Sequence, residues 1–252
     1  MTEMVLFQMW GSFRESLIRE HQFYVEQAEA RLLSQFDHIE EDADRAANAW
    51  LEEKSCQFNP DIHDPADFYE RANEEAIEYY QLLKDMENRT ILSVAAGMYH
   101  EWEKQLRDWM DSEISRWHRG EAVKKRIWAQ SLPELIELFQ GLDWGVKGCN
   151  FYRKLDACRL VVNVYKHGAG PSFDELKTSY SEYVPDRFYE VTGWEGQFLG
   201  YTDLRLSVDQ LREFSQAILE FWRSVPENIF SSEQFEVPRW FENAFNKDRD
   251  DS

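Results

Sequence analysis

The sequence predicts a mainly α-helical protein, built as a multi-helix bundle. Most windows of the chain repeat their apolar residues at intervals of three and four, which is the spacing of an amphipathic helix, and strand-like alternation is scarce. The 252 residues are 43% hydrophobic and 15% aromatic, so they can supply a sizeable core. Only the Tyr-, Pro- and Gly-rich region near 180–206 departs from this pattern, and we expect a mixed loop with a short strand or extended arm there.

The first half of the chain predicts an N-terminal helical pair, a loop and further helices. Residues 4–36 carry apolar side chains at near-heptad intervals, and a second helix follows from Glu40 to Trp50. A loop with two Xaa-Pro steps is expected over 56–65, after which 66–85 resume the helical pattern with many exposed acids. The strongest helical pattern covers 90–117, where aromatic and aliphatic residues form one buried stripe.

The second half predicts shorter helices separated by Gly and Pro. A helix over 122–142 is interrupted at Pro133, and a turn over 141–148 precedes a helix that ends at Gly168. A short helix is expected over 173–180, and a clean one over 207–225, capped by Ser207. The charged end, 246–252, is expected to be disordered.

This organisation predicts three parts: an N-terminal helical pair (1–56), a helical bundle (65–225) and a C-terminal extension (226–252). The N-terminal pair either stands apart or continues into the bundle. No apolar run approaches the ~18 residues of a membrane span, and no secretory signal is evident, so we expect a cytoplasmic protein without a membrane partner. The three cysteines and six histidines lack the spacing of a disulfide framework or a zinc site, so no metal is expected.

The charge is uneven along the chain. The net charge of −20 opposes broad binding to nucleic acid, because Lys and Arg supply most of the affinity for phosphate. Yet 116–166 hold ten Lys and Arg against five Asp and Glu, a local +5. This segment is either a functional basic patch or a chance drift of charge along amphipathic helices.

The helix that ends at Gly168 is the best candidate for a site. Arg159, Asn163 and His167 lie within about 80° of one another on a helix that is apolar on its other faces. Because an unpaired buried polar group costs ~1–3 kcal/mol, this polar stripe needs partners inside the protein or a substrate. The stripe also lies within the basic segment.

The run Asn163-Val-Tyr-Lys-His-Gly168 resembles the signature helix of HEPN-domain proteins, which are helical bundles, many of them ribonucleases. A weaker resemblance covers Tyr99-His-Glu-Trp-Glu103, so that the likeness spans about 90–168. It implies a homodimer that cleaves RNA without a metal or other cofactor, by attack of the ribose 2′-hydroxyl on the adjacent phosphate.

The resemblance also implies roles for individual residues. Arg159 would hold the phosphate, His167 would transfer a proton to the leaving oxygen, and Asn163 would orient a phosphate or base. Glu103 would position Arg159. The neighbouring cations expected to bind RNA are Lys166, Arg153 and Lys154.

The sequence departs from the family motif, and this leaves alternatives open. Seven residues separate Arg159 from His167, where the family has four to six, and Val162 precedes Asn163 where the family has the Arg. Each residue also has a structural interpretation. Arg159 would pair with Asp156 or another acid, Asn163 would bond to backbone, Glu103 would be solvated, and His167 would cap its helix.

Two functional hypotheses follow. The first is a HEPN-like ribonuclease of a bacterial toxin–antitoxin or phage-defence system, a setting that only the resemblance implies. The second is a non-catalytic, acidic interaction subunit that binds a protein partner, as an accessory, inhibitory or nucleic-acid-mimicking protein.

Overall fold

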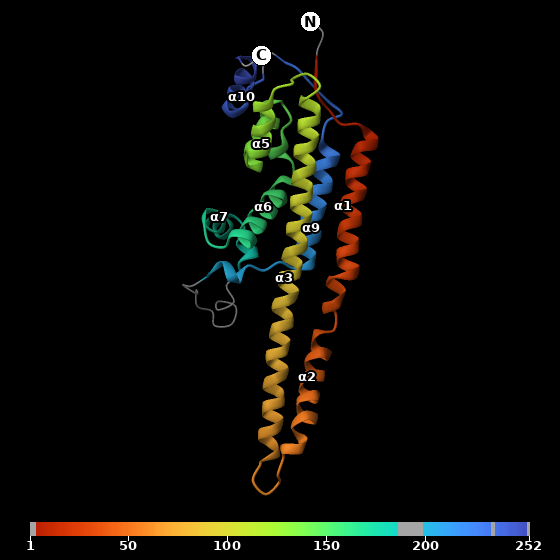
Figure 1. Cartoon of the computed structure of the whole chain (residues 1–252), viewed down its shortest axis with the longest axis vertical. Coiled ribbons are helices and arrows are strands. Elements are labelled where there is room, and N and C mark those ends of the chain that lie inside the picture. The colour runs from red at the N-terminus through yellow and green to blue at the C-terminus, as the bar shows by residue number, and fades with distance from the viewer. Residues whose placement is uncertain (1–3, 186–198, 233–234, 251–252) are drawn as a thin grey trace.

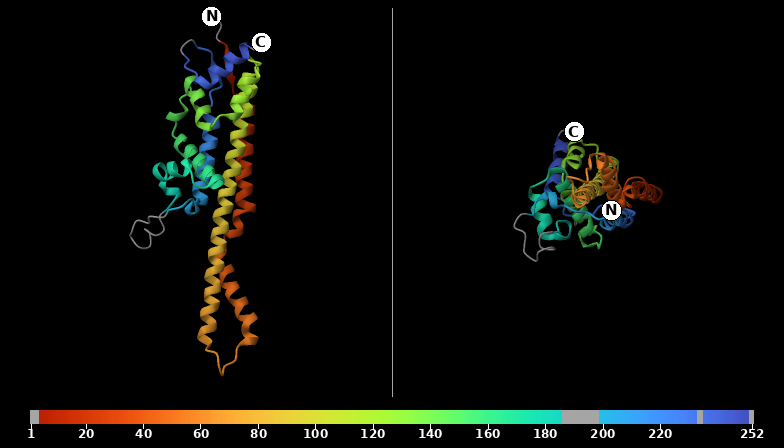
Figure 2. Two further views of the ribbon diagram at one scale, coloured as in Figure 1. Left: turned by 60° about the vertical axis from the view of Figure 1, so that its left-hand side comes forward. Right: turned by 90° about the horizontal axis from the view of Figure 1, so that it is seen from below.

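The structure is a computed structural model, and it describes residues 4–185, 199–232 and 235–250. It confirms the mainly α-helical, multi-helix fold. The molecule is elongated: a compact body holds both termini at one end, and a two-helix stalk projects from the other (Figures 1 and 2). Within the described residues, no helix has both the length and the apolarity needed to cross a membrane.

One helix, α3 (Pro65–Ile114, 50 residues), is the axis of the whole molecule. Asp64 caps its start by accepting a hydrogen bond from the backbone of Ala66, at 2.9 Å, and Pro65 occupies the first turn, where its missing N–H costs nothing. At 1.5 Å per residue, α3 is about 75 Å long. The two helices expected over 66–85 and 90–117 are therefore one, because no Pro or Gly lies between them.

The stalk, residues 39–90, consists of α2 (Ile39–Lys54), the 3₁₀ turn η2 (Ser55–Gln57), a short loop and the first half of α3. α2 packs along α3 (Figure 1). Only three of its residues are fully buried, namely Ile39, Ala43 and Ala72. The stalk is therefore a thin hairpin whose apolar side chains are half-buried or exposed.

The body is assembled around the second half of α3. There α3 contacts α1 (Gly11–Arg31), α6 (Tyr152–His167) and α9 (Val208–Ser224). Ser207 caps α9 as expected, accepting a hydrogen bond from the backbone of Gln210 at 3.1 Å. The core between these helices is rich in aromatic side chains, including Trp102, Phe214, Phe221 and Trp222.

Shorter helices cover the outside of the body: α4 (Glu121–Ala129), α5 (Leu132–Gly141), α7 (Pro171–Ser179) and α10 (Arg239–Asp250). A Gln130–Ser131 break and a capping box between Ser131 and Glu134 separate α4 from α5. The expectation of disorder from 246 is wrong as far as residue 250. Asp248 of α10 is buried and accepts hydrogen bonds from the backbone of Ala122 and Val123, at the start of α4.

The sheet of the described region joins residues far apart in sequence. β1 (Val5–Gln8) pairs antiparallel with β2 (Asn228–Phe230). The expected helix over 4–36 is thus wrong at its start, and the 3₁₀ turn η1 (Leu33–Phe36) follows α1. No strand forms over 199–206, which hold the 3₁₀ turn η5 (Tyr201–Asp203), while η4 (Ser181–Tyr183) follows α7. The rest of the expected mixed loop, 186–198, lies outside the described residues.

Candidate functional site

Helix α6 has the two faces that its sequence predicts. The side that packs on α3 and α9 is fully buried, through residues such as Leu155, Cys158 and Val161. Burial raises the pKa of the Cys158 thiol well above its ordinary value, so this cysteine is not an activated nucleophile. Gly168 ends the helix with a positive φ of 72°, a conformation that favours glycine.

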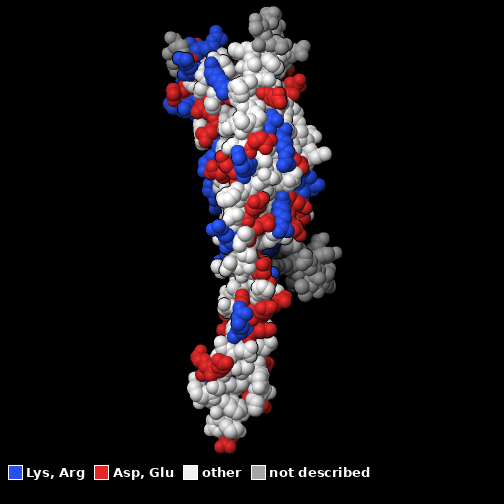
Figure 3. All heavy atoms as spheres, turned by 90° about the vertical axis from the view of Figure 1, so that its right-hand side faces the viewer, with Lys and Arg blue, Asp and Glu red and all other residues white. Residues whose placement is uncertain are grey.

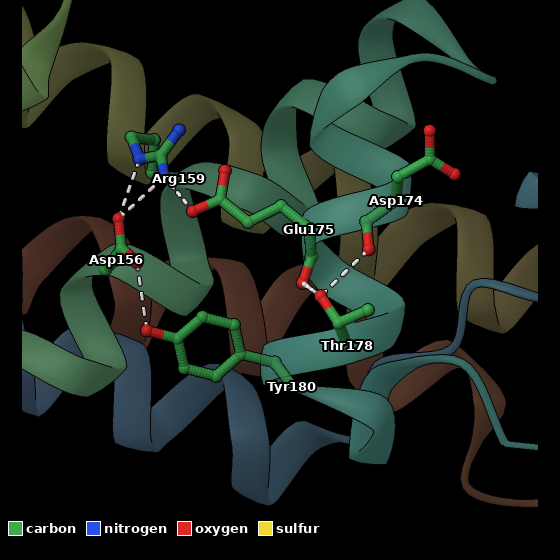
Figure 4. A network of polar contacts seen from close by, with 6 residues as sticks. All are labelled: Asp156, Arg159, Asp174, Glu175, Thr178 and Tyr180. Carbon is green, nitrogen blue, oxygen red and sulfur yellow. Dashed lines mark hydrogen bonds and ion pairs between the residues drawn. The ribbon is translucent and has the colours of Figure 1, made fainter.

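Arg159 is held in a network of polar side chains between α6 and α7 (Figure 4). Its guanidinium lies 2.8 Å from Asp156 Oδ1, one helical turn away, and 3.4 Å from Glu175 Oε1 on α7. The hydroxyl of Tyr180 donates to the other oxygen of Asp156, at 2.9 Å. The pairing with Asp156 is the structural alternative considered from the sequence.

The network neutralises Arg159 and limits its access to solvent. The side chain is 13% exposed. Burial alone would lower the pKa of Arg159, but the hydrogen bond that it donates to Asp156 and the nearby carboxylate charges outweigh burial and raise that pKa. Burial and the hydrogen bond to Asp156 also raise the pKa of Tyr180. A phosphate at Arg159 would therefore compete with two carboxylates that already pair with Nε and Nη2 of its guanidinium.

The other two residues of the stripe lie towards the end of α6. Asn163 is half-buried, whereas His167 and the neighbouring Lys166 are exposed. Neither His167 nor Lys166 forms an ion pair with any described residue. Eight residues of helix place Arg159 about 12 Å along the axis from His167, so the two do not meet within one chain.

Glu103 forms no hydrogen bond or ion pair with Arg159 in the described part of the chain, although the resemblance implies that it positions this arginine. It pairs instead with Arg107, one turn along α3, and its other oxygen lies 3.8 Å from His100. Arg107 is buried and also donates to the backbone of Ile127 at the end of α4. Residues at i and i+4 lie side by side on a helix, so Arg107 reaches Glu103 within α3 and forms an ion pair with its carboxylate. The Glu103 side chain is 20% exposed and pairs with Arg107, so it is neither fully solvated nor, among the described residues, an ion-pair partner of Arg159.

The remaining expected RNA-binding residues differ in their availability. Lys154 lies 2.6 Å from Glu213 of α9, and its ammonium also donates to the Tyr183 hydroxyl at 3.4 Å. Arg153 is exposed, with its guanidinium 5.6 Å from the centre of the Tyr180 ring. Five of the ten cations in 116–166 are paired with acids in this way: Arg116, Lys124, Lys147, Lys154 and Arg159. Half of the cations of the basic segment are thus neutralised in three dimensions.

The stalk is a second candidate surface, which the sequence showed only as a run of acids. Residues 39–90 contain fifteen Asp and Glu against five Lys and Arg, a net charge of −10, which is half of the charge of the whole chain. Acidic side chains spread along the stalk with few basic ones among them (Figure 3). Large apolar side chains are exposed between the acids: Ile62, Tyr69, Ile77, Tyr79, Leu82 and Met86.

No group of three or more His, Cys, Asp or Glu with the geometry of a metal site occurs among the described residues. Comparisons with protein-family models, with curated proteins and with solved structures find no match to this chain. The function is therefore argued from the two surfaces alone.

Proposed function

We propose that this protein is a non-catalytic interaction protein that uses its acidic stalk to bind a basic protein partner. The charge of the stalk carries the proposal: a net −10 on a thin hairpin that projects away from the body. Like charges gathered on one projecting element raise the local potential and attract a partner of opposite charge. Exposed apolar side chains between the acids would add contact area that charge alone does not supply.

The state of Arg159 supports this role over catalysis. A phosphate-binding arginine must offer its donors to the substrate, and Nε and Nη2 of Arg159 already face Asp156 and Glu175. Removing one member of a buried ion pair leaves an uncompensated charge. The network explains Arg159, the first residue of the polar stripe, as a contact that joins α6 to α7.

The test compares charge reversals on the stalk and on the body. Glu74 and Glu78 are exposed on the stalk, and Glu15 and Glu26 are exposed on α1; none of the four forms an ion pair in the described structure. We expect Glu74→Lys with Glu78→Lys to lower recovery of a bound partner from native cells at least ten-fold, measured by quantitative mass spectrometry. The matched pair Glu15→Lys with Glu26→Lys should retain it. Equal recovery by both double variants would contradict the proposal.

A metal-independent ribonuclease remains a second candidate, favoured by the exposed end of α6. His167 and Lys166 are accessible there, next to Asn163, and a second copy of the chain could bring its own α6 against them. In this proposal the protein is a homodimeric, HEPN-like effector of a bacterial toxin–antitoxin or phage-defence system. The resemblance is its support.

The ribonuclease candidate has a direct test. A mixed RNA pool is incubated in EDTA with the wild-type protein and with His167→Ala, and circular dichroism and light scattering establish fold and oligomeric state. Cleavage by the wild type that disappears only in His167→Ala would support catalysis. Intact RNA with a folded wild-type protein would favour the binding role.

A further inference from the structure

The far end of the stalk contains a small apolar pocket. It has a volume of about 320 Å³ and lies where α2 ends and α3 begins. Six residues line it: Leu51, Ser55, Phe58, Pro65, Phe68 and Tyr69. We name this feature the tip pocket. In Figures 1 and 2 the end of α2 and the start of α3 form the part of the stalk most distant from the body.

Ring contacts hold the wall of the tip pocket in place. The rings of Phe58 and Phe68 meet edge to face at 5.2 Å between centres, and Trp50 and His63 lie against Phe68 at 5.9 and 5.5 Å. The loop beneath is hydrogen-bonded, since His63 Nδ1 accepts from the backbone N–H of Asn59 at 3.0 Å. Tyr69 remains 67% exposed at the edge of the pocket. Edge-to-face packing of this kind is favourable beyond the area that it buries, which favours a preformed pocket.

The segment that forms the tip pocket is acidic, and we call its acidic side chains the rim. Residues 50–71 contain six Asp and Glu against two Lys and Arg, a net −4. Of the two cations, Lys54 is already paired with Glu53 at 2.7 Å. A second copy of the chain would bring another −4 to the same place, so charge opposes self-association through the tip. A basic ligand is complementary to the rim.

We propose that the tip pocket receives one apolar side chain of a basic peptide segment, with the flanking cations of that segment on the acidic rim. This inference rests on the proposed binding function and names the chemistry of the partner. Ligand sites span roughly 300–1,000 Å³, and a pocket at the low end suits a single anchoring side chain. An anchoring side chain in a well-packed pocket, surrounded by contacts that exclude water, is the usual arrangement of a binding hot spot.

The length of the stalk suits this role. From Pro65 to Thr90, twenty-six residues of helix extend about 39 Å at 1.5 Å per residue. An anchor bound at the tip therefore leaves the rest of the partner free to lie along the acidic stalk. Specificity would come from the pocket, and the rate of association from the charge.

The experiment uses two synthetic peptides as probes. Both carry four lysines on each side of a central residue, which is Phe in one and Ser in the other, and both bear a fluorescent label for anisotropy. Burying a Phe side chain contributes about 1.5–3 kcal/mol, so we expect the Phe peptide to bind the full-length protein at least ten-fold more tightly. A Leu51 methyl resonance, read by NMR, should shift with the Phe peptide only.

A variant that fills the pocket and a matched control outside it locate the effect. Ser55→Trp fills the tip pocket from an exposed position and should abolish the preference for Phe, whereas Leu82→Ser, 61% exposed on the stalk outside the pocket, should leave it unchanged. Circular dichroism checks that both variants fold. Tyr69→Ala, which removes one wall without filling the cavity, should reduce the preference.

The outcomes separate the pocket from the wider function. Any of three results overturns the proposal for the tip pocket: equal binding of the two peptides, no binding of either, or a preference for Phe that survives Ser55→Trp. If both peptides bind equally and weaken together as salt rises, the acidic stalk keeps its binding role and only the pocket fails. If Phe is preferred but the stalk charge reversals leave partner recovery intact, the pocket stands and the proposed function fails.

Discussion

The buried histidine between α1 and α9 makes the stability of the body sensitive to acid. His21 is 7% exposed, and its Nε2 lies 2.9 Å from the hydroxyl of Ser215. Burial lowers the pKa of His21 from 6.5 to about 4. The folded protein therefore keeps this imidazole neutral at a pH at which the unfolded chain has already taken up a proton.

The sign and size of the effect follow from the two pKa values. Above about pH 6.5 His21 is neutral in both states and the stability is complete; below it the unfolded state binds the extra proton and the free energy of unfolding falls. The loss ends near the folded pKa of about 4. A difference of this size corresponds to about 3 kcal/mol in full, of which about 2 kcal/mol is lost between pH 7 and pH 5.

The assay is urea unfolding of the wild type and of His21→Gln across that range. The glutamine removes the titrating group while it can still bond to Ser215, and the carboxylates common to both proteins cancel in the comparison. We expect the wild type to lose about 2 kcal/mol more than the variant between pH 7 and pH 5. Parallel pH profiles, or an NMR titration that places the folded pKa of His21 near 6.5, would refute the reasoning.

Two further perturbations test how the outer elements are held. Gly120→Ala would place its Cβ 2.0 Å from the Asp248 carboxyl, so it should displace α10 and lower the free energy of unfolding, measured in urea, by about 1–3 kcal/mol. The Cβ of the control Gly145→Ala meets nothing within 4 Å, so this variant should leave the free energy of unfolding unchanged. Asn88 holds the extended segment 204–206 on α3, through hydrogen bonds of 3.0 and 3.1 Å to the backbone of its two ends. Asn88→Ala should lower the free energy of unfolding by about 2 kcal/mol and speed hydrogen exchange of the Leu206 amide, which donates to Asn88. An unchanged exchange rate would mean that other contacts hold the segment.

The sequence was informative where the cause of a structure is local. The end of α6 at Gly168 and the cap of α9 at Ser207 depend on residues within one turn, and both were found. The pairing of Glu103 with Arg107 is also local, and its i, i+4 spacing could have predicted it. The family resemblance directed attention to Arg159 instead.

The features that the sequence did not predict depend on distant segments. β1 forms because β2, more than two hundred residues later, offers a backbone to pair with, and four residues beside a long helical pattern carry little signal of their own. The sequence around Asp248 predicts a charged, disordered tail, whereas in the structure α10 places Asp248 at the start of α4. The sequence predicts two helices where the structure has α3 alone. The apolar pattern changes within α3 because its first half packs on α2 and its second half packs on α1, α6 and α9.

The basic segment and the acidic stalk show why a charge count along the chain is a weak guide to function. The segment 116–166 has a charge of +5, yet half of its cations are neutralised by acids, Lys154 by an acid on another helix. In the stalk only five of the fifteen acids pair with a basic side chain, among the described residues: Glu41, Asp42, Glu53, Asp85 and Glu87. The two charges of an ion pair cancel each other's field beyond a few ångströms, and salt screens the field of unpaired charges over about 8 Å. The unpaired acids therefore dominate the electrostatic potential that an approaching partner experiences. Binding to the stalk should therefore weaken steeply with salt, while any binding confined to the apolar tip pocket should persist.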